Sequence, residues 1–161
     1  MNTGQMLITI GALALLSIVI LRVNNNFLST STVLMENKFG VLAVSIGTSI
    51  LEEAKGKSFD QNTDTMAVTS LASLTSIGPE SGEVDPLFND FDDYDGLVRH
   101  DSTMPSAPFK IECDVNFINA DNPDGTTASK TWHKKLTVMV TSDFMTDTIR
   151  LSSIYSYFYF R

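Results

Sequence analysis

Four aspartates close together in the middle of the chain are the residues best suited to chemistry. Asp90, Asp92, Asp93 and Asp95 are followed directly by Gly96. Closely spaced carboxylates supply the hard oxygen ligands that Ca²⁺ prefers. The register is not that of an EF-hand loop, because the spacing differs and the glutamate of the twelfth loop position is missing. We therefore favour a solvated acidic turn capped by its own aspartates, with weak or absent calcium dependence, and keep a calcium site as the alternative.

Other reactive side chains are few. His100 falls in the acidic region and His133 at the start of a predicted strand, and neither has an obvious nucleophile partner. The chain also lacks the short motifs of serine hydrolases, zinc proteases and nucleotide-binding loops. Cys113 is the single cysteine and falls on the apolar face of a predicted strand, so we expect a buried, unpaired thiol. The sequence thus predicts no catalytic residue, no favoured metal, no cofactor and no enzymatic activity.

The charge balance is acidic and uneven. The chain of 161 residues has 11 Lys and Arg against 19 Asp and Glu, for a net charge of -8. We do not expect the chain to bind nucleic acid, because binding phosphates needs clustered basic residues. Ten acids lie between residues 58 and 101 with Arg99 as the only base, whereas residues 1–21 carry no charge. The parts of the chain therefore suit different environments.

The apolar N-terminal segment has the length of a membrane span. Met6–Leu21 reads MLITIGALALLSIVIL, with Thr9 and Ser17 as its only polar side chains. The uncharged stretch of 21 residues would form a helix about 31 Å long, which just spans a bilayer core. A buried helix of a soluble domain is disfavoured because the segment has no polar face. A cleaved secretory signal is disfavoured because the first residues carry no base and no typical cleavage site follows Leu21.

Helical periodicity continues beyond this segment. Apolar residues recur at the spacing of an amphipathic helix; they are Phe27, Leu28, Val33, Leu34, Phe39, Leu42, Ile46, Ile50 and Leu51. The first proline is Pro79 and Gly56 is a suitable stop, so one helix over about residues 3–55 is predicted. The asparagines at 24–26 would disturb it locally, and residues 33–51 would hold a C-terminal domain.

The C-terminal third alternates with period two, as half-buried strands do. Strands are predicted over 109–117, 134–142 and 148–160, with a turn over Asn119–Gly125. They would form an antiparallel meander, covered on one face by the amphipathic part of the helix. The predicted fold class is α+β, with a long N-terminal α-helix, apolar and then amphipathic, packed on a C-terminal antiparallel β-sheet.

Three regions follow from these patterns. Residues 1–56 form the long helix, of which 1–26 are the hydrophobic membrane or filament core. Residues 57–108 are an acidic region of mainly extended loop, in which Met66–Leu74 could form a short strand or helix. Residues 109–161 form the sheet.

This arrangement resembles the type IV pilin and pseudopilin family. Gly4–Ile10 (GQMLITI) is similar to the G-F-T-L-I-E-L processing motif, with the glycine and the Leu-Ile pair in the same places. Asn89–Gly96 resembles the D-D-x-D-D-Y-x-G stretch of minor pilins of the mannose-sensitive haemagglutinin class, and Lys134–Ser142 resembles their penultimate strand. Two positions depart from the processing motif: Thr9 replaces a glutamate, and Gln5 replaces the aromatic residue that begins the mature chain.

The resemblance implies a structural subunit of an extracellular type IV pilus-like filament. Its partners would be further copies of the chain in a helical homo-oligomer, the assembly machinery, and the inner membrane before assembly. Gly4 and Gln5 would flank the processing site, and we expect the leader to be retained because Met1–Gly4 carries no Lys or Arg. The polymer core would comprise ten apolar side chains: Met6, Leu7, Ile8, Ile10, Leu13, Leu15, Leu16, Ile18, Val19 and Ile20.

One alternative shares the same apolar helix. The chain could be a single-span, membrane-anchored envelope protein, or a minor component of a pilus or secretion machine, whose acidic domain binds another protein. A membrane-anchored enzyme finds no support in the residues.

Overall fold

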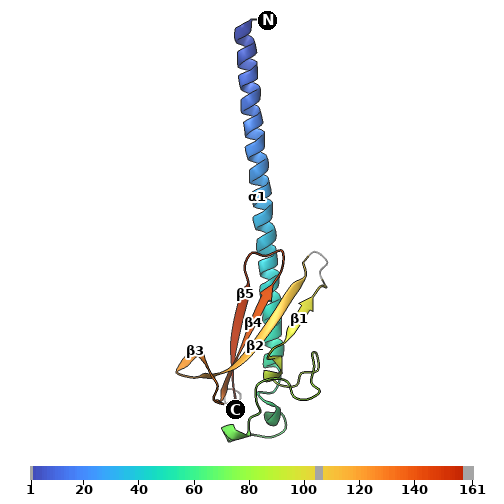
Figure 1. The fold of residues 1–161 in the computed structure, drawn as a ribbon, viewed down its shortest axis with the longest axis vertical. Coiled ribbons are helices and arrows are strands. Elements are labelled where there is room, and N and C mark those ends of the chain that lie inside the picture. Colours follow the sequence, from blue (N-terminus) through green and yellow to red (C-terminus); the bar gives the residue numbers. More distant parts are fainter. Residues whose placement is uncertain (1, 104–106, 158–161) are drawn as a thin grey trace. The chain divides into compact units, whose positions relative to one another are not determined.

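The computed structural model describes residues 2–103 and 107–157. Its first element, α1, runs from Thr3 to Lys55, as predicted, and the asparagines at 24–26 do not interrupt it. The chain divides into two compact units, Met1–Lys38 and Phe39–Arg161. The first unit is the N-terminal part of α1, and the second combines the rest of α1 with the sheet (Figure 1).

The sheet is antiparallel throughout and has the strand order β1-β2-β4-β5, with β3 paired to β2. The strand bounds are β1 Val98–Asp101, β2 Phe109–Asn119, β3 Asn122–Thr127, β4 His133–Thr141 and β5 Ile149–Ser156. The predicted α+β class is confirmed, and β2, β4 and β5 form the predicted meander. Residues 158–160 of the predicted last strand lie outside the described residues.

Two strands were not predicted. β1 belongs to the region expected to be loop, and β3 occupies most of the stretch expected to be a turn, which shrinks to Ala120 and Asp121. Both strands contain residues that favour turns or are neutral, and both form because β2 offers hydrogen-bond partners on its edge. Tertiary pairing therefore overrides local propensity in these two segments.

The remainder of the acidic region contains three short 3₁₀ helices. They are η1 Gln61–Thr63, η2 Leu71–Ser73 and η3 Asp92–Tyr94. Asp60 caps η1 and Ser70 caps η2, each by accepting a hydrogen bond from a backbone N–H two residues later. The ambiguous stretch Met66–Leu74 therefore contains a single 3₁₀ turn and no strand.

The C-terminal part of α1 lies along one face of the sheet (Figure 1). Its buried residues recur every three or four positions; they are Phe39, Ala43, Gly47, Ile50 and Ala54. The packing segment thus begins at Phe39 and not at residue 33, since Val33 is 51% and Leu34 64% exposed. The periodicity identifies the apolar face of a helix, but it does not say how far along the helix a covering sheet extends.

Gly47 sets the closeness of this packing. A Cβ atom added there would lie 2.8 Å from Leu151 Cδ1 and 3.5 Å from Val140 Cγ2. The residues beneath α1 come from alternate positions of β2 and β4 and include Ile111, Val138 and Val140, all at 1% exposure or less. Glycine therefore allows the helix backbone to approach the strands more closely than any larger residue would.

Candidate functional site

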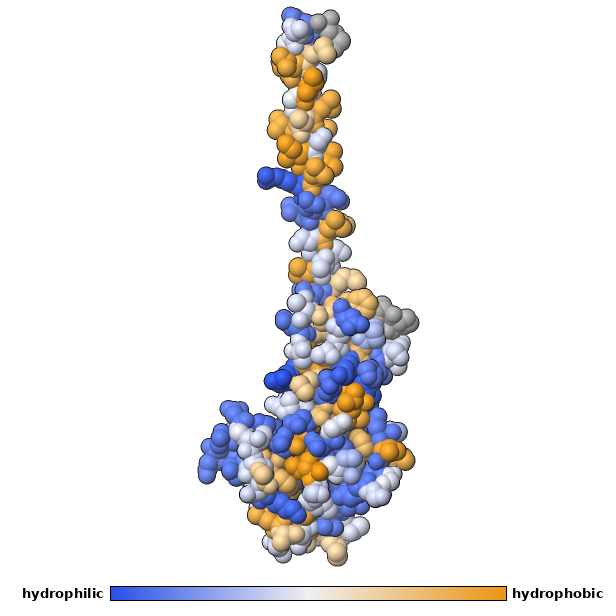
Figure 2. All heavy atoms as spheres, viewed as in Figure 1, coloured by the Kyte–Doolittle hydropathy of each residue, from blue (hydrophilic) through white to orange (hydrophobic). Residues whose placement is uncertain are grey.

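The first candidate site is the apolar segment of α1. The ten side chains predicted to form a polymer core are 48–73% exposed in the isolated chain. This helix is long and apolar enough to cross a membrane, and none of its most hydrophobic stretch is buried within the protein. Figure 2 shows the apolar side chains along this segment. A surface of this kind needs either lipid or other protein to cover it.

The polar side chains of this segment do not disturb its apolar character. Thr9 Oγ1 donates to the carbonyl of Met6 at 2.8 Å, and Ser17 Oγ donates to that of Leu13 at 2.9 Å. Both hydroxyls are therefore satisfied by the helix backbone. The segment can enter an apolar environment without leaving these donors unpaired.

The second candidate site surrounds a fully buried lysine in β4. Lys134 Nζ donates to the carbonyl of Phe59 at 2.9 Å, to Asp60 Oδ2 at 3.1 Å and to Asp92 Oδ1 at 2.7 Å. The same nitrogen lies 4.6 Å from the centre of the Phe59 ring and 5.6 Å from that of Phe117. The three hydrogen bonds use the full donor capacity of the ammonium group.

Asp60 is the better satisfied of the two acids that contact Lys134. Its carboxylate accepts hydrogen bonds from the backbone N–H groups of Asn62 and Thr75 and from the hydroxyl of Thr75. Asp92 Oδ2, in contrast, is buried without a hydrogen-bond partner among the described residues. Lys134 therefore connects β4 with the segment after α1 and with η3.

The turn that contains η3 is built by its own aspartates. Asp90 Oδ1 accepts from the backbone N–H groups of Asp92 at 2.9 Å and Asp93 at 3.2 Å. Asp93 Oδ2 accepts from the backbone N–H groups of Asn89 at 2.8 Å and Asp90 at 3.0 Å. One oxygen of each carboxylate is thus fixed by the backbone, as in ordinary Asx turns.

Burial changes the protonation of these acids. It raises the pKa of Asp90 to about 8, and the neighbouring carboxylates of Asp92 and Asp93 act in the same direction. The pKa values of Asp92 and Asp93 are also raised, with burial as the largest cause, although Lys134 opposes this at Asp92. In a site of low dielectric constant, these carboxylates carry negative charge less readily than ordinary aspartates.

The prediction of a turn capped by its own aspartates is thus confirmed, but the expectation that the turn is solvated is wrong. Asp90 and Asp93 are 0% exposed and Asp92 is 1% exposed. The four aspartates also do not converge on one point, because Asp92 contacts Lys134 and Asp95 Oδ1 accepts from the backbone N–H of Val115 at 2.9 Å. Asp90 and Asp93 instead approach Glu80, a residue that the sequence did not single out.

Cys113, His100 and His133 all lie in strands of the sheet. Cys113 is buried and unpaired, as predicted, and burial raises the pKa of its thiol to about 12. His133 is half-buried, and its Nδ1 lies 2.7 Å from Oγ of Ser156 on the neighbouring strand. The two residues are directly paired in the ladder of β4 and β5, so this contact is a cross-strand one.

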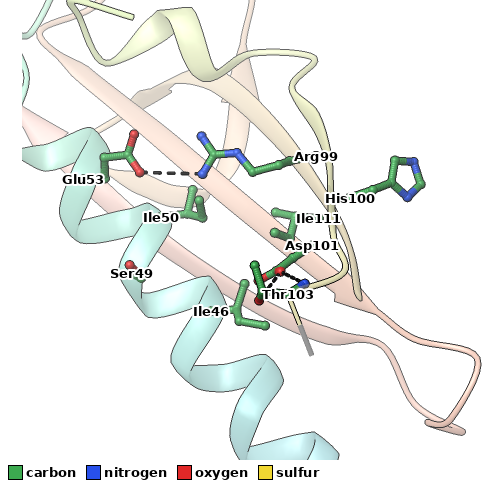
Figure 3. A pocket seen from close by; sticks show the side chains of 9 residues that line it. All are labelled: Ile46, Ser49, Ile50, Glu53, Arg99, His100, Asp101, Thr103 and Ile111. Carbon is green, nitrogen blue, oxygen red and sulfur yellow. Dashed lines mark hydrogen bonds and ion pairs between the residues drawn. The ribbon is translucent and has the colours of Figure 1, made fainter. Parts of the chain in front are cut away.

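A groove of about 360 Å³ lies between α1 and β1. Figure 3 shows Ile46, Ile50 and Glu53 of α1 facing it, with the His100 side chain pointing away from the helix. The guanidinium of Arg99, which lines this groove, already pairs with Asp85 and lies 3.7 Å from Glu53 Oε2.

Comparisons with known proteins give no family for this chain. It matches no protein-family model, and neither a curated protein nor a solved structure is significantly similar to it.

Proposed function

We propose that this protein is a structural subunit of an extracellular filament of the type IV pilin kind, which polymerises through the apolar segment Met6–Leu21. The observation that carries the proposal is the exposure of this segment on all its sides. Burying one Leu, Ile or Val side chain stabilises the buried state by about 1.5–3 kcal/mol relative to exposure to water. A bundle of such helices from several subunits would remove this surface from water.

The continuity of α1 supports a filament over a simple membrane anchor. One continuous helix contains the apolar segment and also five buried residues of the second unit. In a polymer, this continuity would hold each sheet domain to the same helix that enters the bundle. A membrane anchor requires only the apolar segment, and its connection to a soluble domain can be a flexible linker.

A single-span membrane protein is the second candidate function. The length and composition of α1 are compatible with membrane anchoring. The two candidates share one state, because a filament subunit would reside in the membrane before assembly. They differ in whether the protein leaves the membrane as a polymer.

Electron microscopy of sheared surface material tests the proposal. Cells that make the full chain are sheared, and the released fraction is labelled with gold-conjugated antibody against the sheet domain. We expect labelled filaments in which the chain is the principal protein. Recovery of all the protein from the membrane fraction as a monomer would contradict the filament and favour the anchor.

A further inference from the structure

Three carboxylates from two segments of the acidic region meet in a buried place. One carboxylate oxygen each of Glu80, Asp90 and Asp93 lies within 4.8 Å of those of the other two. Two oxygens bound on opposite sides of Ca²⁺ at 2.4 Å would be about 4.8 Å apart, so this spacing suits ligands of one ion. We propose that Glu80, Asp90 and Asp93 bind a calcium ion.

Unpartnered oxygens at these same residues are a second, separate observation. Glu80 Oε2, Asp90 Oδ2 and Asp93 Oδ1 are buried and accept no hydrogen bond from any described residue. Asp90 and Asp93 are themselves fully buried. A buried carboxylate oxygen without a donor is costly, and the cost disappears when a cation coordinates it.

The charge of Lys134 acts on Asp90, but Lys134 forms no ion pair with the described acids of this cluster. In the described ranges, Lys134 makes its ion pairs with Asp60 and Asp92, and no Lys or Arg pairs with Glu80, Asp90 or Asp93. The backbone N–H groups of the turn reach only one oxygen of Asp90 and one of Asp93. The second oxygen of each accepts no hydrogen bond from a described residue, so it is available to bind an ion.

Neighbouring groups hold the two segments together. Glu83 accepts a hydrogen bond from the backbone N–H of Glu80 at 3.1 Å and another from the side-chain amide of Asn89. Asn89 Oδ1 is a further buried oxygen that accepts no hydrogen bond from a described residue. The proposed ligand atoms are all hard carboxylate oxygens, which favour Ca²⁺ or Mg²⁺ over zinc. Ca²⁺ tolerates irregular geometry with many protein oxygens, whereas Mg²⁺ needs a near-octahedral shell and keeps several waters.

A calcium ion bound by Glu80, Asp90 and Asp93 departs from the expected weak or absent calcium dependence and has a different ligand set from the one that the sequence suggested. The sequence pointed to Asp90, Asp92, Asp93 and Asp95, but the structure gives Asp92 to Lys134 and Asp95 to the backbone of β2. Glu80 lies ten residues before Asp90 and offers the third carboxylate. The inference does not depend on whether the chain forms filaments.

Calorimetric titration of the full chain tests the site. The protein is held in detergent micelles, stripped with EDTA, dialysed and titrated with CaCl₂ or MgCl₂. We expect one Ca²⁺ per chain, with a dissociation constant of about 10⁻⁵–10⁻³ M, and weaker binding of Mg²⁺. Glu80→Gln and Asp93→Asn should each weaken calcium binding at least tenfold, whereas Asp121→Asn, at an exposed acid in a turn, should not change it.

Two calorimetric results would overturn the proposal: the absence of calcium binding to the wild-type chain, or binding that Glu80→Gln and Asp93→Asn leave unchanged. A measurement on the wild-type chain avoids dependence on the folding of variants. Terbium substituted for calcium should show emission sensitised by Tyr94, the residue after Asp93, and CaCl₂ should quench it by competition. Sensitised emission that excess CaCl₂ does not reduce would count against the site.

Discussion

Lys134 Nζ lies 2.7 Å from Asp92 Oδ1, and both side chains are buried in the second unit. The pair joins β4 to η3, and the hydrogen bond of Lys134 to Asp60 adds a third segment. Pairs of this kind are weak evidence for stability, because desolvation offsets most of the attraction. Removing one partner is different, since it leaves the other charge buried without compensation.

We expect Lys134→Met to lower the free energy of unfolding by about 3–5 kcal/mol, because Asp60 and Asp92 would lose their cation. Lys135→Met is the matched control on the same strand. Among the described residues Lys135 Nζ donates to the carbonyls of Pro123 and Asp124, both on exposed residues, so its removal should cost about 1 kcal/mol or less.

Urea unfolding in detergent micelles, followed by the fluorescence of Trp132, measures both variants. In the Lys134→Met background, Asp92→Asn should cost less than it does in the wild-type chain, because the two residues are coupled. Equal effects of Lys134→Met and Lys135→Met would show that the buried contacts contribute little.

A lysine in the middle of the apolar segment should prevent assembly. Leu15→Lys would place a charge in the proposed bundle without a partner, at a cost of several kcal/mol. We expect loss of filaments in electron micrographs, while the circular dichroism of the sheet domain is retained. Ala128→Lys adds the same charge at an exposed position and should leave filaments intact.

Deletion of residues 1–26 provides a second check on the same segment. The shortened chain should be soluble and monomeric in analytical ultracentrifugation, because it lacks the apolar surface of Met6–Leu21. Filaments formed by this truncation would contradict the proposed role of the segment.

A large side chain at position 47 should be destabilising. Gly47→Leu would press on Leu151 and Val140, and overpacking of this kind costs about 1–3 kcal/mol. The same substitution at Gly40, where an added Cβ meets nothing within 4 Å, should raise stability by up to about 1 kcal/mol, since leucine favours a helix more than glycine does. Thermal unfolding of the two variants in detergent would show shifts of opposite sign.

Cys113 should react slowly with thiol reagents in the native state. Its pKa of about 12 leaves about one thiol in 10,000 ionised at pH 8, against about a quarter for an unfolded thiol of ordinary pKa. We expect labelling at least about 1000-fold slower in buffer than in urea. A cysteine at position 128 in a Cys113→Ala background is the exposed control, and rapid native labelling of Cys113 would contradict its burial.

Much of the fold follows from patterns within short stretches of the chain. The charge-free run before Arg22 and the spacing of three or four residues after it predict α1 with the bounds that the structure has. The alternation around Ile111 and Val138 predicts β2 and β4 to within two residues at each end. These features are predictable because helix and strand periods are local properties of a chain that must bury one face.

The contacts within the candidate sites could not be predicted from local patterns. In the structure Lys134 lies on the same inward face of β4 as Leu136, and its acid partners at positions 60 and 92 could not be read from the strand itself. Likewise, β3 depends on the edge of β2, and Glu80 joins Asp90 and Asp93 only after the acidic region has folded back on itself. The sequence by itself therefore determined α1, β2, β4 and β5 and which surface is apolar. Only the tertiary structure decided which charges meet, because residues far apart in the chain are brought together by packing and not by any local preference.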